Sequence, residues 1–592
     1  MKQPTEAMLC GRRYIDAFSE IELLEDFVWE EVLERWYIRF RICLCSECIS
    51  IPSKTEWYLT IQDNYPEGNI DIYPAVENGI KDTFFHQSNN GYIEKNGLWR
   101  KGKLCLKHPL AEIVGCYTEP KEADARIGWN LSRTLEWIEK ANRGTLVGDD
   151  DYFELPDMVI QNIGRIVFDE DEVSLMEWES SGNKSGTCNL IFKEKNTLYA
   201  EKFIDLKGNT CKSTVWGSGI TNTCIKGEKA IWIMLEKIPV INGWQVPSTY
   251  DELMEVLIEQ NVDFQSVIIP LLDRIRDGKR HYLLLGFPIP EKFNKDDYMV
   301  HWWALRLPCL TCKKTKVKGF RSNRATFIWN DLTNVFKKDD LLDWSISENR
   351  SQKQVMNRGR YSSKVSRLKY VIIGAGSIGS IIAEQLVRAG INKMLIIDGD
   401  YLEAGNIVRH ALNYSYVGMN KAKALKCYLE LLNCHANISV IPEHFRKETV
   451  AQLSSYDVVI DCTAQDNVLS LLQEFPSKVT LCTVSVGYKA EKIYFMYHAG
   501  GGFSASCFYE RFAKFIKNDQ ELLKIEALPW EGVGCWSPVF PAMGADMQLA
   551  GMIALEQLMI LLERQEKGNC AIVYEKITDE NGIMKSYDRI FV

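Results

Sequence analysis

The stretch Lys369-Tyr-Val-Ile-Ile-Gly-Ala-Gly-Ser-Ile-Gly-Ser380 decides the fold of the second half of this chain. A short β-branched run is followed by three glycines with the spacing G-x-G-x-x-G. This spacing predicts a strand that turns at Gly374, a backbone that a phosphate can approach at Gly376, and a helix that packs closely at Gly379. The helix should begin near Ser377, where its free N–H groups and positive dipole end favour an anion. The motif therefore predicts a nucleotide-binding site.

The sequence after the glycines alternates strands with helices. We expect helices at 378–389, 421–432 and 544–563, and strands at 393–398, 439–441 and 458–461. This alternation predicts a parallel, doubly wound sheet of the Rossmann-like type. Asp398 closes the second strand, where an acidic side chain can hydrogen-bond the ribose hydroxyls of a nucleotide.

Length and composition limit the class of protein. At roughly 150 residues per domain, 592 residues predict three or four domains. No apolar run approaches the ~20 residues of a membrane span, and the first residues lack an apolar signal segment, so we expect a cytoplasmic protein whose 18 cysteines are mostly thiols. A net charge of −9 without a dense Lys/Arg block argues against nucleic-acid binding. Proteins or small molecules are the expected partners.

We predict an α/β multidomain chain with three parts: an α+β domain at 1–145, an α+β linker or docking domain at 150–345, and the Rossmann-like domain at 350–592. The first part should open with an amphipathic helix from Ser19 to Trp36, because Ser-Glu-Ile-Glu has the spacing of a capping box. Antiparallel strands at 37–43, 57–62 and 69–73 and a closing helix at 126–142 should follow.

The middle part contains no recognisable catalytic constellation. Short apolar runs predict buried strands at 230–235, 281–287 and 299–307, and a capped helix should begin after Ser248 or Thr249. His281 and His301 lie inside these runs, where a satisfied core histidine is expected. The C-x-x-C pair Cys309 and Cys312, and the cysteines at 43, 45 and 48, are interpreted as incidental rather than as a zinc site.

Three short elements of the first part carry a resemblance: Tyr65-Pro66, His86-Gln-Ser-Asn89 and Gly102-Lys-Leu-Cys-Leu106. Together with the helix-and-strand order, they resemble ubiquitin-conjugating enzymes, which carry a Tyr-Pro, an HPN and a G-x-I-C-L element. The resemblance implies that Cys105 holds a thioester and that His86 stands for the HPN histidine. Gln87 replaces the proline, and either Asn89 or Asn90 serves as the asparagine. The alternative is that Cys105 is a small buried hydrophobe.

Further motifs follow the glycine-rich stretch: Asp398-Gly-Asp-Tyr-Leu-Glu-Ala-Gly-Asn-Ile-Val-Arg409, Gly418-Met-Asn-Lys421 and Asp461-Cys-Thr-Ala-Gln-Asp-Asn467. With the glycines they resemble the ThiF- or MoeB-like adenylating domain of ubiquitin-activating enzymes and of bacterial enzymes that activate sulfur carriers.

This second resemblance implies ATP and Mg²⁺ as cofactors. It implies that Asn406 and Arg409 contact the triphosphate and that Lys421 neutralises its developing charge. It also implies that Arg360 reaches into the site of a neighbouring subunit. Asp466 is the favoured magnesium ligand, with Asp461 as the substitute. A C-terminal carboxylate is already a nucleophile, so its adenylation needs positioning and cations rather than a base.

A second thiol is expected in the turn-rich loop Pro529-Trp-Glu-Gly-Val-Gly-Cys-Trp-Ser-Pro538. Cys535 occupies the loop in which the activating family carries its catalytic cysteine, and a nearby helix N-terminus would lower a thiol pKa. A buried loop cysteine or a metal ligand is the alternative. Cys507, after the glycines at 500–502 that suggest disorder, is a weaker rival.

Two thiols and an adenylating site predict a relay: an acyl adenylate, a thioester on Cys535, a thioester on Cys105, and an amide to an amine. The order of the parts, with the conjugating-like part first and the activating-like part last, resembles that of the bacterial anti-phage enzymes of cyclic-oligonucleotide signalling systems (CBASS). That resemblance implies a cGAS-like nucleotidyltransferase as the protein substrate, a lysine or small amine as acceptor, and a homodimer. The alternatives are a sulfur-carrier adenylyltransferase with non-catalytic N-terminal domains, an NAD-dependent oxidoreductase, and a degenerate regulatory scaffold.

Overall fold

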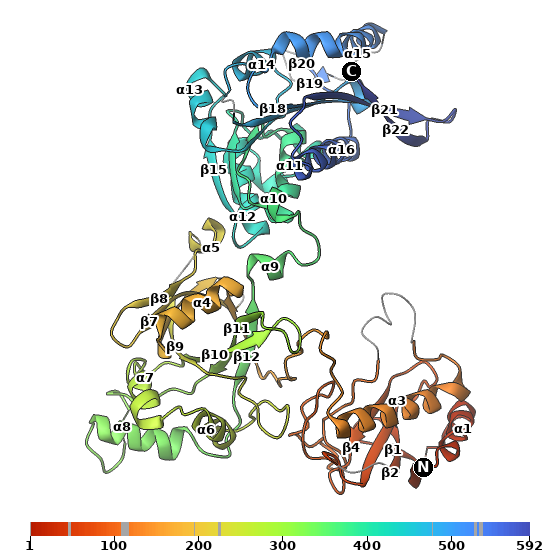
Figure 1. Ribbon diagram of the computed structural model, residues 1–592, viewed down its shortest axis with the longest axis vertical. Coiled ribbons are helices and arrows are strands. Elements are labelled where there is room, and N and C mark those ends of the chain that lie inside the picture. Colours follow the sequence, from red (N-terminus) through yellow and green to blue (C-terminus); the bar gives the residue numbers. More distant parts are fainter. Residues whose placement is uncertain are drawn as a thin grey trace. The chain divides into compact units, whose positions relative to one another are not determined.

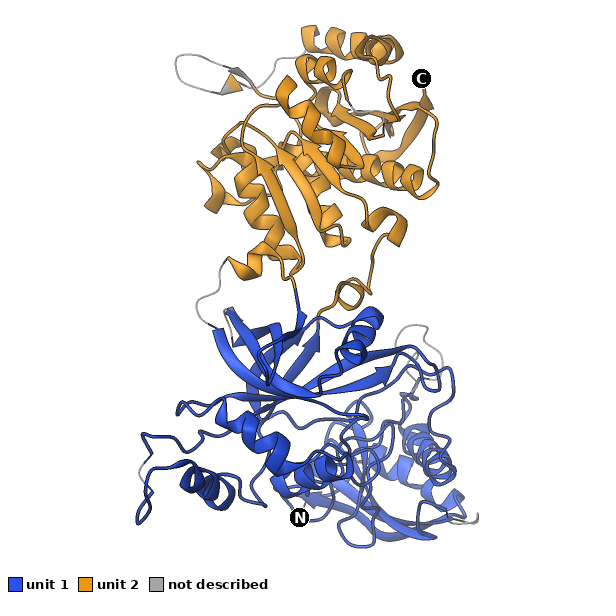
Figure 2. Ribbon diagram, turned by 60° about the vertical axis from the view of Figure 1, so that its left-hand side comes forward, with its two compact units in different colours: residues 1–214, 226–349 blue, residues 215–225, 350–592 orange. Residues whose placement is uncertain are grey.

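The computed structural model describes residues 2–44, 49–107, 118–193, 196–222, 227–315, 317–475, 478–525, 530–531 and 537–592. The chain divides into two compact units, Met1–Thr214 with Lys226–Asn349 and Val215–Ile225 with Arg350–Val592 (Figure 2).

The first part of the chain is an antiparallel meander covered by a long helix. Its elements are α1 (Glu6–Arg12), β1 (Ile21–Glu30), β2 (Arg35–Cys43), β3 (Lys54–Ile61), β4 (Ile70–Pro74) and α3 (Ala123–Arg143), and the strands pair in the order β1-β2-β3-β4. Helix α3 lies beside this sheet (Figure 1). Apolar residues of α3, among them Ile127, Leu131 and Ile138, belong to one core with Trp57 and Leu59 of the sheet. The three predicted strands and the predicted closing helix are confirmed.

The predicted helix from Ser19 to Trp36 is wrong, because this segment forms β1 and the start of β2. Trp29 pairs with Trp36 across the two strands, and their rings lie 5.5 Å apart. The register shifts twice along β1, between Leu23 and Glu25 and again before Val28. These irregularities break the period-2 alternation of a strand, so the apolar residues recur at intervals that resemble a helix.

The middle part is a mixed eight-stranded sheet with the order β5-β12-β11-β10-β9-β6-β7-β8. Its strands are β5 (Asn162–Phe168), β6 (Ser185–Lys193), β7 (Thr197–Asp205), β8 (Thr210–Ser213), β9 (Gly227–Met234), β10 (Tyr282–Pro290), β11 (Tyr298–Arg306) and β12 (Trp344–Asn349). Its helices are α4 (Glu172–Ser181), α6 (Tyr250–Glu259), α7 (Ile269–Asp273) and α8 (Arg324–Asn330). The three predicted strands are confirmed, and Thr249 caps α6 by accepting from the Glu252 N–H.

The C-terminal part contains a second eight-stranded sheet, ordered β15-β14-β13-β16-β17-β18-β21-β22. Its strands are β13 (Tyr370–Ile373), β14 (Lys393–Ile397), β15 (Asn437–Ile441), β16 (Val458–Asp461), β17 (Thr480–Val486), β18 (Lys492–Ala499), β21 (Cys570–Thr578) and β22 (Met584–Phe591). The predicted strands β13, β14, β15 and β16 pair in parallel as expected. β17, which was not predicted, is parallel to β16, and β18, β21 and β22 extend the sheet with antiparallel pairs.

Helices cover both faces of this sheet. They include α5 (Ser218–Thr221), α9 (Gln352–Val355), α10 (Ser363–Ser366), α11 (Ser377–Arg388), α12 (Lys421–Leu432), α13 (Lys447–Val450), α14 (Asp466–Leu472), α15 (Ala505–Ile525) and α16 (Gly544–Glu563). Along β13, Tyr370 and Ile372 belong to the core under α11, α12 and α16, whereas Val371 and Ile373 belong to the core under α14 and α15. A small ribbon of β19 (Trp530–Glu531) and β20 (Ser537–Pro538) lies apart from the sheet.

Helix α16 is long and apolar enough, by length and composition, to cross a membrane. In the structure 56% of its most apolar window is buried. Ala550, Ala554 and Leu558 belong to the core shared with α11, and a methyl group added at Gly551 would lie 3.1 Å from the Ile381 side chain. The apolar composition of α16 is therefore accounted for by packing inside the domain.

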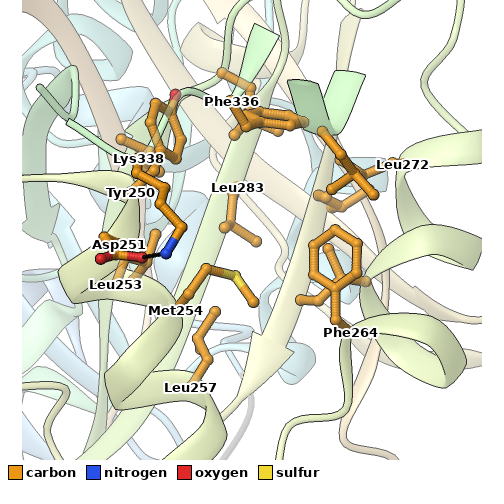
Figure 3. A pocket seen from close by; sticks show the side chains of 15 residues that line it. Tyr250, Asp251, Leu253, Met254, Leu257, Phe264, Leu272, Leu283, Phe336 and Lys338 are labelled. Carbon is orange, nitrogen blue, oxygen red and sulfur yellow. Dashed lines mark ion pairs between the residues drawn. The ribbon is translucent and has the colours of Figure 1, made fainter. Parts of the chain in front are cut away.

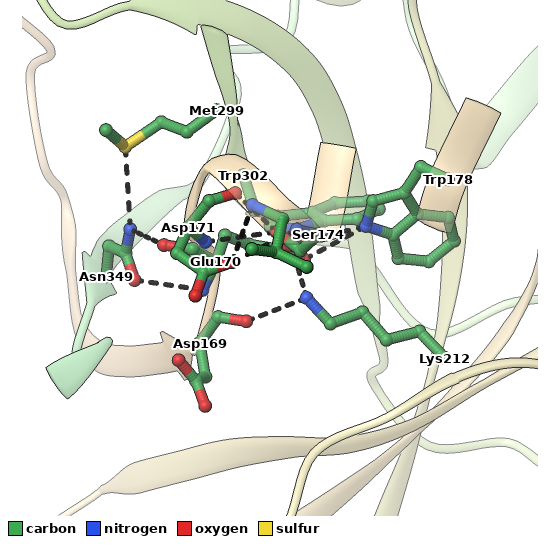
Figure 4. A network of polar contacts seen from close by, with 10 residues as sticks. Asp169, Glu170, Asp171, Ser174, Trp178, Lys212, Met299, Trp302 and Asn349 are labelled. Carbon is green, nitrogen blue, oxygen red and sulfur yellow. Dashed lines mark hydrogen bonds and ion pairs between the residues drawn. The ribbon is translucent and has the colours of Figure 1, made fainter. Parts of the chain in front are cut away.

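A charged network lies beside the middle sheet (Figure 4). The Glu170 side chain is 1% exposed and forms an ion pair with Lys212, whose side chain is 9% exposed. The indole N–H groups of Trp178 and Trp302 also donate to Glu170, at 3.2 Å and 2.9 Å. Side chains from α4, β8 and β11 therefore all bind the same carboxylate, that of Glu170.

We expect Lys212→Met to lower the free energy of unfolding by about 3–5 kcal/mol, because it leaves a buried carboxylate without its cation. Denaturant unfolding followed by fluorescence measures this change. Lys184→Met is the matched control: its pair with Glu236 is exposed at both side chains (69% and 68%), so its effect should stay within about 1 kcal/mol. Equal effects of the two variants would contradict this account of the network.

Candidate active site

The glycine-rich loop has the geometry that its spacing predicts. Gly374 has a φ of +89°, a conformation that favours glycine. A Cβ at Gly379 would lie 1.9 Å from the Gly374 carbonyl oxygen, so only glycine lets α11 pack this closely on the end of β13. A Cβ at Gly376 would meet no heavy atom within 4 Å. Gly376 caps α11, so a phosphate can approach the backbone at the start of this helix.

Two side chains bind the backbone of the loop residue Ala375, one at its N–H and one at its carbonyl oxygen. The Ala375 N–H donates to Asp398 Oδ2 at 2.7 Å, and Asp398 Oδ1 accepts the Asp400 N–H at 2.8 Å. His410 Nε2 lies 2.7 Å from the Ala375 carbonyl oxygen. Asp398, which the sequence predicts as the ribose ligand, holds this loop in the structure.

His410 is neutral in this position. Its Nδ1 accepts the Leu412 N–H at 3.1 Å, so the ring proton resides on Nε2, which donates to Ala375. Burial lowers the pKa of His410 to about 4. No sequence motif pointed to His410; its place directly after Arg409 was the available signal.

Arg409 lines a cavity of about 220 Å³ beside the start of α11. Its guanidinium donates to the Phe540 carbonyl oxygen at 2.6 Å and lies 5.8 Å from the centre of the Phe540 ring. The other lining residues come from α11, from the ends of β16 and β17, and from α16: Ser377, Ile378, Cys462, Ala464, Val484, Ser485, Val486 and Met547. Ligands of doubly wound sheets bind at this carboxyl edge of the strands.

Lys421 and Asn406 lie on the segments after β14. Lys421 begins α12, and its Nζ is 3.0 Å from Asp400 Oδ2 with only 14% of the side chain exposed. Asn420 donates to the Asp398 and Asp400 carbonyl oxygens at 3.0 Å and 3.1 Å, which fixes the start of α12 against the end of β14. Asn406 Oδ1 accepts the Glu403 N–H at 3.0 Å.

The two candidate magnesium ligands differ in their surroundings. Asp461 pairs in register with Ile373 at the end of β13 and is 2% exposed. Its Oδ1 accepts the Thr463 N–H and hydroxyl at 3.0 Å and 2.7 Å, and burial raises its pKa to about 6. Asp466 is exposed at the start of α14 and accepts the Tyr509 hydroxyl. Carboxylate oxygens of both kinds suit Mg²⁺.

Arg360 does not line the cavity of Arg409. It lines a polar cavity of about 360 Å³ together with Lys353, Arg367 and Lys393. Ala389 and Gly390, just past the C-terminal end of α11, also line it. Because the 12 residues of α11 span about 18 Å, this cavity is far from the glycine-rich loop of the same chain.

Cys105 is an exposed cysteine beside the loop of His86. Its N–H donates to the His86 carbonyl oxygen at 2.8 Å. The His86 ring contacts Glu154, with Nδ1 2.8 Å from Oε2, and this contact holds the pKa of His86 above its ordinary value. The atoms packed around the sulfur and, after them, the Glu154 carboxylate raise the pKa of Cys105.

The asparagines of this loop are both buried. Asn90 is 0% exposed and donates to the Ile80 and Asp82 carbonyl oxygens at 2.9 Å and 3.1 Å. Asn89 Oδ1 accepts the Gly91 N–H at 2.9 Å. Gln87, in the place of the family's proline, donates to the Gly102 carbonyl oxygen at 3.1 Å.

The other cysteines take separate places. Cys535 lies outside the described residues, as do the cysteines at 45 and 48. Cys507 lies in the first turn of α15 rather than in a disordered loop, and its sulfur accepts from Arg511 Nε at 3.3 Å. In the part of the chain that the structure describes, no group of three or more His, Cys, Asp or Glu side chains could hold a metal ion.

The middle part contains an apolar cavity of about 330 Å³ (Figure 3). Residues of α6, β10 and the segment around Phe336 line it, including Leu253, Met254, Leu257 and Leu283. Lys338 and Asp251 form an ion pair at its edge, with Nζ and Oδ1 3.0 Å apart. Its chemistry suits apolar contacts rather than catalysis.

Two family models match the chain: the Cap2 central linker domain over residues 144–350 and the ThiF family over residues 349–571. The chain is 34% identical over 102 residues to the adenylyltransferase and sulfurtransferase UBA4 of Candida glabrata, which covers 17% of this chain and 24% of that protein. A crystal structure of E. coli MccB with AMPCPP and MccA aligns with 39% of this chain and 64% of that chain, at 18% identity and a TM-score of 0.29.

The similarity that spans the chain is to the ATP-dependent ubiquitin transferase-like protein Cap2 of Enterobacter hormaechei subsp. hoffmannii. The two are 31% identical over 535 residues, which cover 87% of this chain and 88% of that protein. The chain belongs to the Cap2 family of ATP-dependent ubiquitin transferase-like proteins.

Proposed function

We propose that this chain uses ATP to adenylate the C-terminal carboxylate of a protein and then passes the acyl group from Cys535 to Cys105 and on to an amine. The adenylation step is supported by the position of the glycine-rich loop, which is held by side-chain hydrogen bonds and lies beside the cations Arg409 and Lys421. Asp398 and His410 hold Ala375 in place, and Arg409 lines the adjoining cavity.

The charges around the loop suit transfer to the α-phosphate. The N-terminus of α11 receives phosphate oxygens, while Arg409 and Lys421 neutralise the charge that develops on the departing pyrophosphate. Lys421 is prepositioned by Asp400, so it loses little side-chain freedom when it binds ATP. The incoming carboxylate needs no base. Arg360 completes the site of the other subunit in a homodimer.

Magnesium would be held by Asp466, with Asp461 as the substitute. Bound Mg²⁺ would add a further positive charge on the phosphates. Thr463 keeps the Asp461 carboxylate oriented at the end of β16.

The thiol relay rests on the place of Cys105. Its side chain is exposed, so a partner's acyl group can reach it. Its raised pKa favours the protonated thiol once the acyl group has left. The proposed protein substrate is a cGAS-like nucleotidyltransferase in anti-phage defence, and the proposed acceptor is a lysine or small amine.

We expect Lys421→Ala to reduce ATP–pyrophosphate exchange with the nucleotidyltransferase on the order of 100-fold, because it removes a cation that acts on the transferring phosphates. Lys423→Ala is the matched control, since Lys423 lies on the same helix and is exposed. Exchange that is lost equally in both variants would contradict the role of Lys421.

We expect Cys105→Ala to leave a thiol-sensitive adduct on Cys535, and Cys535→Ala to abolish both thioesters. A non-reducing gel or intact mass, with ATP and the nucleotidyltransferase, measures each adduct. Cys309→Ala, which removes another exposed cysteine, should behave as the unaltered protein. Undiminished product from Cys105→Ala would instead support a sulfur-carrier adenylyltransferase with non-catalytic N-terminal domains.

We expect Asp466→Asn to raise the Mg²⁺ concentration for half-maximal pyrophosphate exchange by about 10-fold or more, and Asp461→Asn to raise it less. Magnesium titrations from pH 5 to 8 distinguish the two ligands. The pKa of Asp461 is about 6, so this carboxyl loses its negative charge as the pH falls through that value. A magnesium requirement that rises steeply below pH 6 would assign the metal to Asp461 instead.

A further inference from the structure

The segment after α3 lies against the loop that carries His86. Glu154 contacts the His86 ring at 2.8 Å, and Asp157 Oδ2 accepts the Asn89 N–H at 3.3 Å. Cys105 adjoins the same loop through its hydrogen bond to the His86 carbonyl oxygen. Glu154 is also close enough to Cys105 to raise the pKa of that thiol. The His86–Glu154 ion pair therefore lies near the exposed Cys105.

The backbone of His86 lies in a region that is uncommon for residues other than glycine. Its φ is +55°, in the left-handed region, where strained non-glycine residues concentrate at functional sites. Because Nδ1 faces the Glu154 carboxylate, the neutral ring carries its proton on Nδ1 and keeps a lone pair on Nε2. The His86 side chain is 33% exposed, so this lone pair belongs to a ring that substrates can reach.

We propose that His86 and Glu154 form the acid–base pair of the Cys105 site, in which His86 takes the proton of the attacking amine and Glu154 is a positioning residue that fixes its tautomer. This inference rests on the proposed thioester at Cys105.

The step balances without a further reactant. The amine nitrogen attacks the thioester carbonyl carbon, a C–N bond forms, and the C–S bond to Cys105 breaks. The proton lost by the nitrogen moves to His86 Nε2 and then to the departing sulfur, whose raised pKa favours the thiol. Thioester and amine become amide and thiol, and the imidazole returns to its neutral form.

The asparagines beside this loop are engaged elsewhere. Both amide hydrogens of Asn90 point to the Ile80 and Asp82 carbonyl oxygens, and Asn89 is 3% exposed. The described charged groups that face the pair are Asp151 and Lys140 around His86, and Lys103 and Lys107 around Cys105. With Nδ1 on the Glu154 carboxylate, His86 presents its Nε2 lone pair as the proton acceptor of this site.

The test measures discharge of the Cys105 thioester. The full-length protein is charged with Mg·ATP and the cGAS-like nucleotidyltransferase, ATP is then removed, and free lysine is added at pH 5.5 to 9. Protonation of the added free lysine affects the unaltered protein and every variant equally. The ratio of a variant's discharge rate to that of the unaltered protein therefore reports on His86 and Glu154 alone. We expect His86→Gln to slow discharge on the order of 100-fold at neutral pH, and we expect the ratio to rise toward 1 as the pH falls, because protonation of His86 removes the base from the unaltered protein alone.

Glu154→Gln should slow discharge about 10-fold and move the midpoint of this pH dependence to lower pH, because the carboxylate that raises the pKa of His86 is gone. Asp157→Asn is the matched control: it weakens the contact of the same segment with Asn89 but leaves the midpoint in place. NMR titration of histidine-labelled protein, assigned with His86→Gln, provides a readout without the reaction, in which Glu154→Gln lowers the pKa of His86.

The outcomes separate the two proposals. Absence of a Cys105 adduct in the unaltered protein would overturn the relay, and the role of the pair with it. Normal charging of Glu154→Gln, with discharge and midpoint equal to those of the unaltered protein, would overturn the pair alone.

Discussion

The close approach of α11 to β13 is the constraint on which the nucleotide domain depends. Gly379 leaves no space for a Cβ, because that atom would lie 1.9 Å from the Gly374 carbonyl oxygen. This contact directs the N-terminus of α11 to the carboxyl edge of the sheet and leaves open space at Gly376. The bonds of Asp398 and His410 to Ala375 then keep the loop from collapsing into that space. Every proposed role at the phosphates follows from this arrangement.

The two proposed reaction sites differ in the charge that their surroundings favour. Around the glycine-rich loop, fixed dipoles and cations favour negative charge, which suits the departure of pyrophosphate. Around Cys105, packing and the Glu154 carboxylate disfavour the thiolate. A thiol with a raised pKa is a slow attacking group at neutral pH but recovers its proton readily after it leaves. A sulfur of higher pKa also leaves more slowly, so release of the acyl group from Cys105 depends on a nearby group that supplies a proton, which is the role proposed for His86.

Sequence reasoning succeeded where a periodic pattern and local signals agree. The predicted bounds of α12, α16 and β16 match the structure because caps, glycines and apolar runs mark their ends. It failed from Ser19 to Trp36, where shifts of register in β1 disturb the strand pattern. Sequence reasoning did not identify His410 and Glu154 for another reason. Each acts on a residue that is distant in sequence, Ala375 and His86, so no local spacing reveals the contact.

Residues of the middle domain contact the loop that carries His86. Glu154 lies in the stretch matched by the linker-domain model, and its neighbour Phe153 donates to the Glu291 carbonyl oxygen at 3.0 Å. A second contact comes from the loop before α6, where the Trp244 N–H donates to the Thr83 carbonyl oxygen at 2.7 Å. The middle domain therefore holds the His86 loop from two sides, and any motion of its sheet that moves residues 151–157 must also change the position of Glu154 relative to His86. The geometry around the Cys105 thiol therefore depends on the middle domain, which lies between this thiol and the nucleotide domain in the sequence.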